Sequence, residues 1–234
     1  MDIIGKAATN YFFNKDPESI QLFIDGYADA EMPPSVFFRT HSKLKSLEQD
    51  ALSLCRGKTL DVGACAGNYS LELIKQGIEV TSLDVSPLLC KIMVKRNLPN
   101  VVQQDIMHLT REKYDTILLM MNGFGIAREM RLLPTFLGHL KSLLAPGGQI
   151  LGDTTDIHYF EADKKIRGRK SKNKAYIGDV EFRLSYKGEN EEFLWVYPDP
   201  DALSKCAIEA GLQPLIAKKG RDFSYLMKLV NRED

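Results

Sequence analysis

The sequence predicts an α/β protein whose core is a mainly parallel sheet with helices on both faces. Short apolar segments alternate with amphipathic segments of about three turns, which is typical of chains in which each strand is followed by a helix. A small-residue turn separates the first strand from the first helix, and a Pro-Gly-Gly turn precedes the fifth strand. At 234 residues, the chain is long enough for one substantial domain with a small appendage.

The central part of the chain holds the clearest strand and helix signals. Ser86 followed by Pro87 is typical of a helix start, and Pro134 predicts a break in a later helix. The residues Ala-Pro-Gly-Gly at 145–148 predict the end of that helix. The predicted strands are 58–62, 79–84, 101–104, 114–121 and 149–153, and the predicted helices are 68–76, 86–97 and 127–144.

The N-terminal part follows a different pattern. Ile20, Phe23 and Ile24 recur at helical spacing, so we expect helical structure from 18 to 56 with a break at 32–35. This gives an N-terminal helical cap over residues 1–57 and a main domain over residues 58–234.

The C-terminal part departs from simple alternation. Residues 158–197 form an insertion in this interpretation, with a basic loop followed by a β-hairpin. The hairpin strands are 176–186 and 192–197, a helix follows at 199–210, and an antiparallel strand pair at 213–217 and 223–229 ends the chain.

Composition and charge exclude several classes of protein. Lysine plus arginine equals aspartate plus glutamate, 31 each, so nucleic acid is not favoured as a partner. No apolar run approaches the roughly 18 residues of a membrane span, and the N-terminus has no apolar leader segment. The four cysteines are scattered and have no histidine beside them, which indicates reduced thiols and no bound metal. We therefore expect a cytoplasmic protein that does not bind membranes.

The most informative segment is 59–70, Thr-Leu-Asp-Val-Gly-Ala-Cys-Ala-Gly-Asn-Tyr-Ser. A strand, a small-residue turn and a helix N-terminus in sequence let a nucleotide-like ligand approach bare backbone. A dinucleotide fingerprint needs G-x-G-x-x-G, and Cys65 and Asn68 occupy its second and third glycine positions here. The spacing that fits is acid-x-Gly-x-small-x-Gly, from Asp61 through Gly63 and Cys65 to Gly67.

With this motif the chain resembles the class I S-adenosylmethionine-dependent methyltransferases, whose first motif is (Asp/Glu)-x-Gly-x-Gly-x-Gly. The resemblance covers about 58–153, because the later motifs follow in order at the predicted strand ends, and the strand pair at 213–229 extends it. It implies a Rossmann-like, mainly parallel seven-stranded sheet with a C-terminal antiparallel strand pair. It also implies S-adenosylmethionine as the methyl donor.

The resemblance assigns roles to the residues at these strand ends. Asp84 would accept hydrogen bonds from both ribose hydroxyls, and Val85 would lie beside the adenine ring. Asp105 would accept from the adenine amine, Ile106 would pack on the ring, and Arg39 would pair with the cofactor carboxylate. The full set of expected cofactor-binding residues is Asp61, Gly63, Cys65, Gly67, Asp84, Val85, Asp105, Ile106, Met121 and Arg39.

The acceptor side carries weaker signals. Asn122, just past the fourth predicted strand, is placed to orient an acceptor, and His158 follows the fifth strand with an unperturbed pKa that suits a base. Seven lysines and arginines at 164–174 are expected to form a solvated loop, with the steering of an anionic substrate as the alternative. We expect a small-molecule acceptor, because the chain has little accessory mass.

Two alternatives remain at this point. The first is a protein of the same fold that binds S-adenosylmethionine without transferring its methyl group, because Cys65 adds a side chain where the cofactor tail passes. The second is an NAD(P)-dependent oxidoreductase, against which the missing glycines count. The oligomeric state is left open, a homodimer included.

Overall fold

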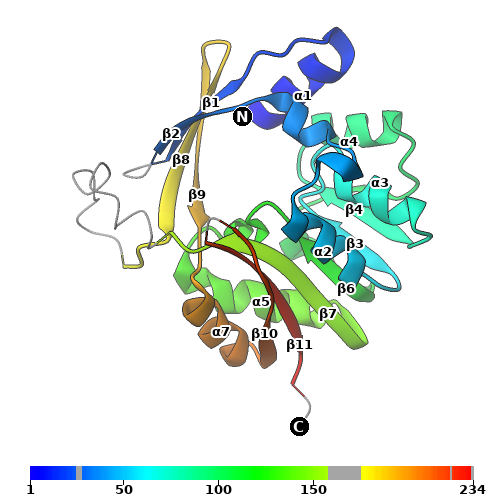
Figure 1. Cartoon of the computed structure of the whole chain (residues 1–234), viewed down its shortest axis with the longest axis vertical. Coiled ribbons are helices and arrows are strands. Elements are labelled where there is room, and N and C mark those ends of the chain that lie inside the picture. The colour runs from blue at the N-terminus through cyan, green and yellow to red at the C-terminus, as the bar shows by residue number, and fades with distance from the viewer. Residues whose placement is uncertain (25–27, 158–174, 222, 233–234) are drawn as a thin grey trace.

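Two β-sheets organise the molecule (Figure 1). The computed structural model describes residues 1–24, 28–157, 175–221 and 223–232. A seven-stranded sheet has the order β10-β11-β7-β6-β3-β4-β5, and a separate four-stranded sheet has the order β2-β1-β8-β9. In the described part of the chain, no helix has both the length and the apolar character needed to cross a membrane.

The seven-stranded sheet confirms the predicted mainly parallel architecture. Five strands are parallel, β11 runs antiparallel to β7, and β10 runs antiparallel to β11. The strands are β3 (Thr59–Val62), β4 (Val80–Asp84), β5 (Val101–Gln103), β6 (Tyr114–Leu119), β7 (Leu144–Thr155), β10 (Leu212–Lys219) and β11 (Ser224–Asn231). The helices of this part are α3 (Asn68–Lys75), α4 (Pro87–Lys95), α5 (Leu133–Ser142) and α7 (Pro200–Glu209).

Alternating side chains of the central strands bury both faces of this sheet. Ile117 and Ile150 point to one face, where they pack in one core cluster with residues of α5 and α7. Leu118 and Leu151 point to the other face, where they pack with residues of α3 and of α2 (Ser46–Leu54). Burial on both faces explains why these strands read as almost continuous apolar runs.

The strand order places a topological switch point between β3 and β6. From β3 the chain adds β4 and then β5 on one side, and afterwards returns to add β6 and β7 on the other. The loops after β3 and β6 therefore diverge and leave a crevice at the carboxyl ends of the strands, which is where ligands bind in such sheets.

The helix predicted around Ile20, Phe23 and Ile24 is wrong. These residues form β1 (Ile20–Ile24), which pairs with β2 (Ala28–Met32) on one side and with β8 on the other. Five residues fit either period, so the spacing alone cannot separate a short strand from one helical turn. The edge of β8 decides between them, because it supplies backbone partners for four of the five residues of β1, from Gln21 to Ile24.

The N-terminal region contains helices at other positions than predicted. The helix α1 (Ile3–Asn14) lies before the segment in which the pattern predicted one. Two short 3-10 turns, η1 (Pro34–Phe38) and η2 (His41–Lys43), precede α2, which confirms helical structure in the second periodic segment.

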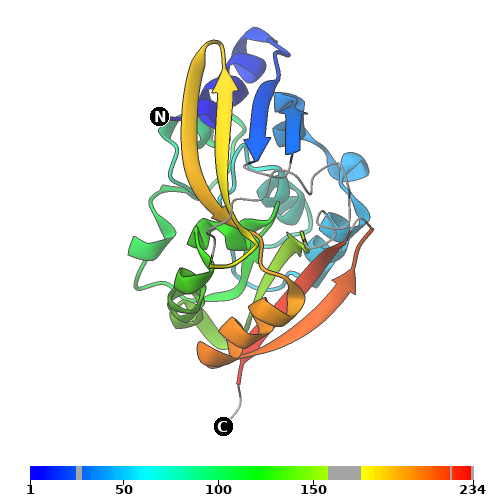
Figure 2. The ribbon, with the colours of Figure 1, turned by 90° about the vertical axis from the view of Figure 1, so that its left-hand side faces the viewer.

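The predicted hairpin exists as β8 (Asp179–Tyr186) and β9 (Glu189–Val196), and it bridges two distant parts of the molecule. At its base, the Met130 N–H donates to Asp179 at 2.7 Å, just after the loop that follows β6. At its tip, Lys187 binds Asp16 at 2.5 Å, just beyond α1, and Glu189 binds Lys6 of α1. Figure 2 shows the four strands of this sheet side by side above the larger sheet.

The segment around Pro134 also differs from the prediction. Pro134 lies in the first turn of α5 instead of breaking a longer helix, because a proline without an N–H suits that position. The residues before it form the 3-10 turns η4 (Gly123–Ala127) and η5 (Met130–Leu132). The Pro-Gly-Gly turn lies within β7, where the pairing register with β6 shifts.

The hairpin base gives a stability prediction. A Cβ atom at Gly125 of η4 would overlap the indole ring of Trp195 in β9, whereas a Cβ at Gly138 of α5 would meet no atom within 4 Å. We expect Gly125→Ala to lower the free energy of unfolding by about 1–3 kcal/mol through overpacking. The matched control Gly138→Ala should raise it by about 0.5–1 kcal/mol, since alanine is the better helix former. Urea unfolding measures both free energies. A Gly125→Ala variant as stable as the wild type would contradict the packing of Trp195 on Gly125.

Candidate functional site

Three residues of the turn after β3 have a left-handed backbone conformation. Gly63, Cys65 and Gly67 have φ values of 68°, 54° and 79°. The N–H groups of Gly63 and Ala64 both donate to the Leu83 carbonyl, at 2.9 and 3.0 Å, which ties the turn to β4. Glycine adopts this conformation at no steric cost, whereas Cys65 is strained by its Cβ atom. The turn therefore keeps the backbone bare at Gly63 and Gly67 and carries a thiol at its centre.

Asp84, the last residue of β4, holds this turn in place. Its two carboxylate oxygens accept the N–H groups of Cys65 and Ser86, each at 2.9 Å. Burial raises the pKa of Asp84 to about 6, against the lowering effect of these backbone hydrogen bonds. The Ser86 hydroxyl donates to Asp2 at 2.5 Å, and Asp2 in turn caps α1 by accepting the Gly5 N–H. The N-terminal helix is thus fixed beside the end of β4.

Asp61 is buried within β3, below the turn. It accepts a hydrogen bond from the Ser70 hydroxyl at 2.6 Å, and the Ser82 hydroxyl donates to Ser70 at 2.7 Å. Burial raises the pKa of Asp61 to about 6, with the Asp84 charge adding to the effect. Ser70 and Ser82 are site residues that the motif did not reveal, although their short hydroxyl side chains at buried positions are a signal.

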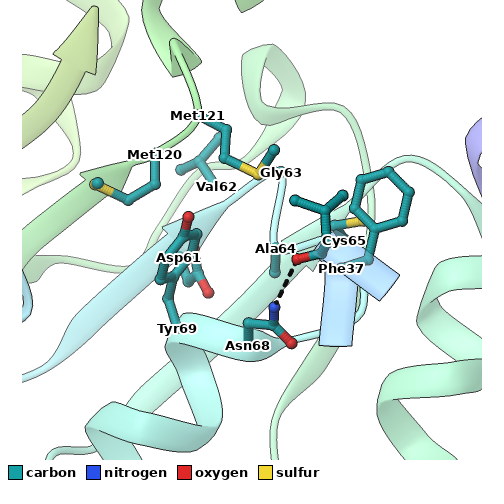
Figure 3. A pocket seen from close by; sticks show the side chains of 11 residues that line it. Phe37, Asp61, Val62, Gly63, Ala64, Cys65, Asn68, Tyr69, Met120 and Met121 are labelled. Carbon is teal, nitrogen blue, oxygen red and sulfur yellow. Dashed lines mark hydrogen bonds between the residues drawn. The ribbon is translucent and has the colours of Figure 1, made fainter. Parts of the chain in front are cut away.

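A pocket opens at the switch point between β3 and β6 (Figure 3). Together with the solvent at its mouth, the pocket volume is about 340 Å³. The Asn68 amide donates to the Val36 carbonyl at 3.2 Å, which holds the η1 segment against the start of α3. The lining residues are Val36, Phe37, Asp61, Val62, Gly63, Ala64, Cys65, Asn68, Tyr69, Met120 and Met121. Four of the residues expected at the cofactor line this pocket: Asp61 from β3, Gly63 and Cys65 from the turn after it, and Met121 from the loop after β6. Gly67 precedes the lining residue Asn68.

The loop after β6 presents two further left-handed residues, Met121 and Asn122, with φ values of 58° and 59°. The Asn122 N–H donates to Asp153 of β7 at 3.2 Å, and the Asn122 side-chain oxygen accepts from Thr155 at 3.1 Å. Burial raises the pKa of Asp153 to about 7. Backbone strain of this kind persists only where the surroundings hold it, and it gathers at functional sites.

Arg39 is held by a carboxylate of the protein itself. Its guanidinium makes a two-pronged ion pair with Glu48 at 2.9 and 2.6 Å, and its Nε–H donates to the Val36 carbonyl at 3.0 Å. Tyr69, which lines the pocket, donates its hydroxyl to the same Glu48 at 2.6 Å. Direct pairing of Arg39 with a cofactor stays a prediction. Sequence reasoning missed Glu48, although its place three residues into the first turn of α2 is typical of a capping box.

The remaining predicted residues lie at the ends of β4 and β5, outside the pocket lining. Asp105 accepts the Met107 N–H at 2.9 Å, and the neighbouring Ile106 is buried. Val85 is 64% exposed, which leaves its side chain open to a ligand that extends along this edge. Their contacts with adenine stay predictions. His158 and the basic run at 164–174 fall outside the described residues.

The site as a whole carries buried negative charge. None of Asp61, Asp84 and Asp153 makes a salt bridge within the part of the chain that the structure describes. Burial also raises the pKa of the Cys65 thiol, so this side chain stays neutral. A ligand with positive charge would supply the missing counter-charge, because an opposite charge favours ionised carboxylates.

Comparisons with known proteins agree with this geometry. The sequence profile of a family described as "Methyltransferase domain" matches residues 59–148. A solved S-adenosylmethionine-dependent methyltransferase from Bacteroides fragilis, in complex with S-adenosyl-L-homocysteine, is 31% identical. That alignment covers 99% of this chain and 95% of the other, with a TM-score of 0.89. No curated protein is detectably similar in sequence. The chain belongs to the S-adenosylmethionine-dependent methyltransferases, and S-adenosylmethionine is its methyl donor.

More distant structures share the fold. The methyltransferase CcbJ from Streptomyces caelestis is 14% identical over 79% of this chain and 89% of the other, with a TM-score of 0.59. The sugar N-methyltransferase KedS8 from Streptoalloteichus sp. ATCC 53650 is also 14% identical, over 85% and 92%, with a TM-score of 0.57. They confirm the Rossmann-like fold class.

The buried acids predict an unusual pH dependence of stability. A carboxyl group whose pKa is raised by folding binds more protons in the folded state, so the free energy of unfolding falls as pH rises between the two pKa values. For Asp61 this interval runs from 3.8 to about 6. Urea unfolding of the ligand-free protein from pH 4.5 to 7.5 should show a loss of roughly 1–3 kcal/mol relative to Asp61→Asn.

The comparison with Asp61→Asn removes the contribution of every other titrating group. The asparagine keeps one oxygen to accept from Ser70 and has no proton to lose. Parallel stability curves for the two proteins would show that Asp61 is not a buried acid with a raised pKa.

Proposed function

We propose that this methyltransferase binds S-adenosylmethionine across the switch point and methylates a small-molecule acceptor beneath the four-stranded sheet. The observation that carries the proposal is the pocket itself, which lies between the loops after β3 and β6 and is lined by Gly63, Cys65 and Met121. The sheet formed by β1, β2, β8 and β9 spans from the loop after β6 to α1, and such a cover suits a compact acceptor better than a macromolecule.

The residues present fit the donor. S-adenosylmethionine supplies, when bound, a methyl group on a positively charged sulfonium. Gly63 leaves open the space that a side chain would take, since the nearest atom to a Cβ there is 3.5 Å away on Ile126. The buried carboxylates of Asp61 and Asp84 match a cationic ligand. Each oxygen of Asp84 uses one lone pair on the backbone, so both retain capacity to accept ribose hydroxyls.

The work of the protein in this reaction is mainly positioning. In-line displacement needs the acceptor atom held opposite the sulfur and water kept away, an effect that can supply roughly 7–11 kcal/mol of the barrier reduction. Met121 and Asn122 form the loop next to the pocket, with Asn122 fixed by Asp153 and Thr155. We propose that this loop orients the acceptor. The thiols of all four cysteines are free, which supports a reducing, cytoplasmic location.

Calorimetry tests the donor site. We expect the protein to bind S-adenosylmethionine and S-adenosylhomocysteine and to show no binding of NAD⁺. Asp84→Asn should weaken the binding of both ligands by about 1.5–3 kcal/mol, because one charge-assisted acceptor for the ribose hydroxyls is lost.

The matched control for this measurement is Glu209→Gln, which removes an exposed acid at the end of α7 and should leave both affinities unchanged. Binding of NAD⁺ in preference to S-adenosylmethionine would overturn the proposed function. Equal affinities of the wild type and Asp84→Asn for both ligands would show that the Asp84 carboxylate does not bind the donor.

A further inference from the structure

The four-stranded sheet presents a cluster of aromatic rings on its inner face, formed by Phe182, Phe193, Trp195 and Tyr197 and called the aromatic wall below. Phe182 and Phe193 are cross-strand partners whose rings stack at 5.4 Å between centroids. Trp195 meets both rings edge-on, at 6.3 and 5.9 Å, and Tyr197 lies 6.1 Å from Phe182. Phe182 is buried, whereas the other three rings are only partly buried. They retain surface that a ligand could cover.

The aromatic wall stands over the carboxyl ends of β6 and β7. Trp195 packs directly on Gly125, which follows β6, and Ile157, which follows β7, lies in the same apolar cluster as Phe182. The loop after β6 also lines the donor pocket through Met120 and Met121. The aromatic wall and the donor pocket are therefore neighbours across a single loop.

Asp153 is the acid at the end of β7 that joins these two regions. It accepts the Asn122 N–H at 3.2 Å, and it makes no salt bridge within the described part of the chain. The ionisable groups that interact with it are Glu48 of α2, Tyr69 of α3 and Tyr197 after β9. Glu48 is already neutralised by Arg39, and the two tyrosines carry no charge near neutral pH because burial raises their pKa values.

Tyr197 links the acid to the aromatic wall. Its ring belongs to the wall, and the hydroxyl of Thr154, next to Asp153, donates to the carbonyl of Pro198, next to Tyr197, at 3.3 Å. The charge of Asp153 also contributes to the raised pKa of the Tyr197 hydroxyl. A carboxylate that is partly shielded from water and has no cation beside it favours a ligand that brings positive charge or a proton. Aromatic faces also attract cations. The carboxylate of Asp153 and the faces of the aromatic wall therefore both favour a cationic ligand.

We propose that the methyl acceptor is an amine on a flat apolar body, with the body against the aromatic wall and the nitrogen at Asp153. This inference rests on the proposed function and names its substrate class. Asp153 then has two roles, since it binds the ammonium group and accepts one of its protons.

The proton and electron balance is complete without a further reactant. The ammonium N–H bond breaks and its proton forms an O–H bond on Asp153, which leaves a lone pair on nitrogen. The nitrogen forms a bond to the methyl carbon as the carbon–sulfur bond breaks, and that electron pair stays on the sulfur of S-adenosylhomocysteine. The product is a methylammonium ion, and Asp153 passes its proton to solvent. A pKa of about 7 for Asp153 suits this exchange near neutral pH.

The test uses binding to the protein saturated with S-adenosylhomocysteine, so that it does not depend on turnover. Calorimetric titrations compare benzylamine, phenethylamine and tryptamine with the corresponding alcohols and with indole-3-acetate. We expect at least one amine to bind ten-fold more tightly than its alcohol and indole-3-acetate not to bind. Absence of binding by all three amines, or an alcohol or the carboxylate as the tightest ligand, would overturn the proposal.

Matched variants separate the two parts of the proposed site. Asp153→Asn should abolish the preference for the amine over its alcohol, with Glu192→Gln on the exposed face of β9 as the control. Phe193→Leu should weaken the amine and the alcohol alike, with Leu194→Ala as the control, because Leu194 is 45% exposed on the opposite face of the same strand. An amine preference that persists in Asp153→Asn would overturn the role of Asp153.

The affinity for S-adenosylhomocysteine, measured for each variant first, keeps the two proposals distinguishable. If S-adenosylhomocysteine does not bind to the wild type, the proposed function itself fails. If it binds with the same affinity to the wild type and to every variant while the amines show no preference, only the substrate class fails.

Discussion

The carboxylate of Asp84 makes the hydrogen bonds on which the rest of the site depends. One oxygen holds the Cys65 N–H in the turn after β3, and the other holds the Ser86 N–H at the start of α4. Through Ser86 and Asp2 the same group fixes the beginning of α1. Because α1 contacts the tip of the β8–β9 hairpin, this carboxylate indirectly connects the donor turn to the sheet above it. The donor turn and the cover of the acceptor side are thus parts of one hydrogen-bonded arrangement.

Burial of this and other acids gives the site its chemical character. Asp61 lines the donor pocket, Asp84 holds the turn beside it, and both have pKa values raised to about 6. Burial of these carboxyl groups lowers the stability of the ligand-free protein. A cationic ligand stabilises their ionised forms, and this stabilisation adds to the free energy of binding. The strained residues Cys65 and Met121 add to the same cost on opposite sides of the pocket. The structure is therefore destabilised locally where the ligand binds.

The sequence was sufficient for the sheet and for the donor turn, because each of these depends on local patterns. Buried strands, glycine turns and helix caps are encoded within a few residues, and Asp84 could be placed from the predicted strand end together with the family resemblance. The predictions that were wrong or incomplete concern contacts between segments that are distant in the sequence. Ile20–Ile24 forms a strand because it pairs with the edge of β8, about 160 residues later. Arg39 pairs with Glu48 because the fold of the N-terminal region brings the two side chains together. The aromatic wall was equally hidden, since its rings come together only when β8 and β9 pair.

In our proposal, buried negative charge at the switch point selects the sulfonium of the donor. S-adenosylmethionine and S-adenosylhomocysteine share their adenosine and amino-acid parts and differ in this methyl group and its charge, so the ratio of their affinities isolates the effect. Calorimetry between pH 7.5 and 5.5 measures that ratio directly. We expect S-adenosylmethionine to lose affinity relative to S-adenosylhomocysteine as pH falls through about 6 and the acids become protonated. A ratio that stays constant over this range would contradict the proposal.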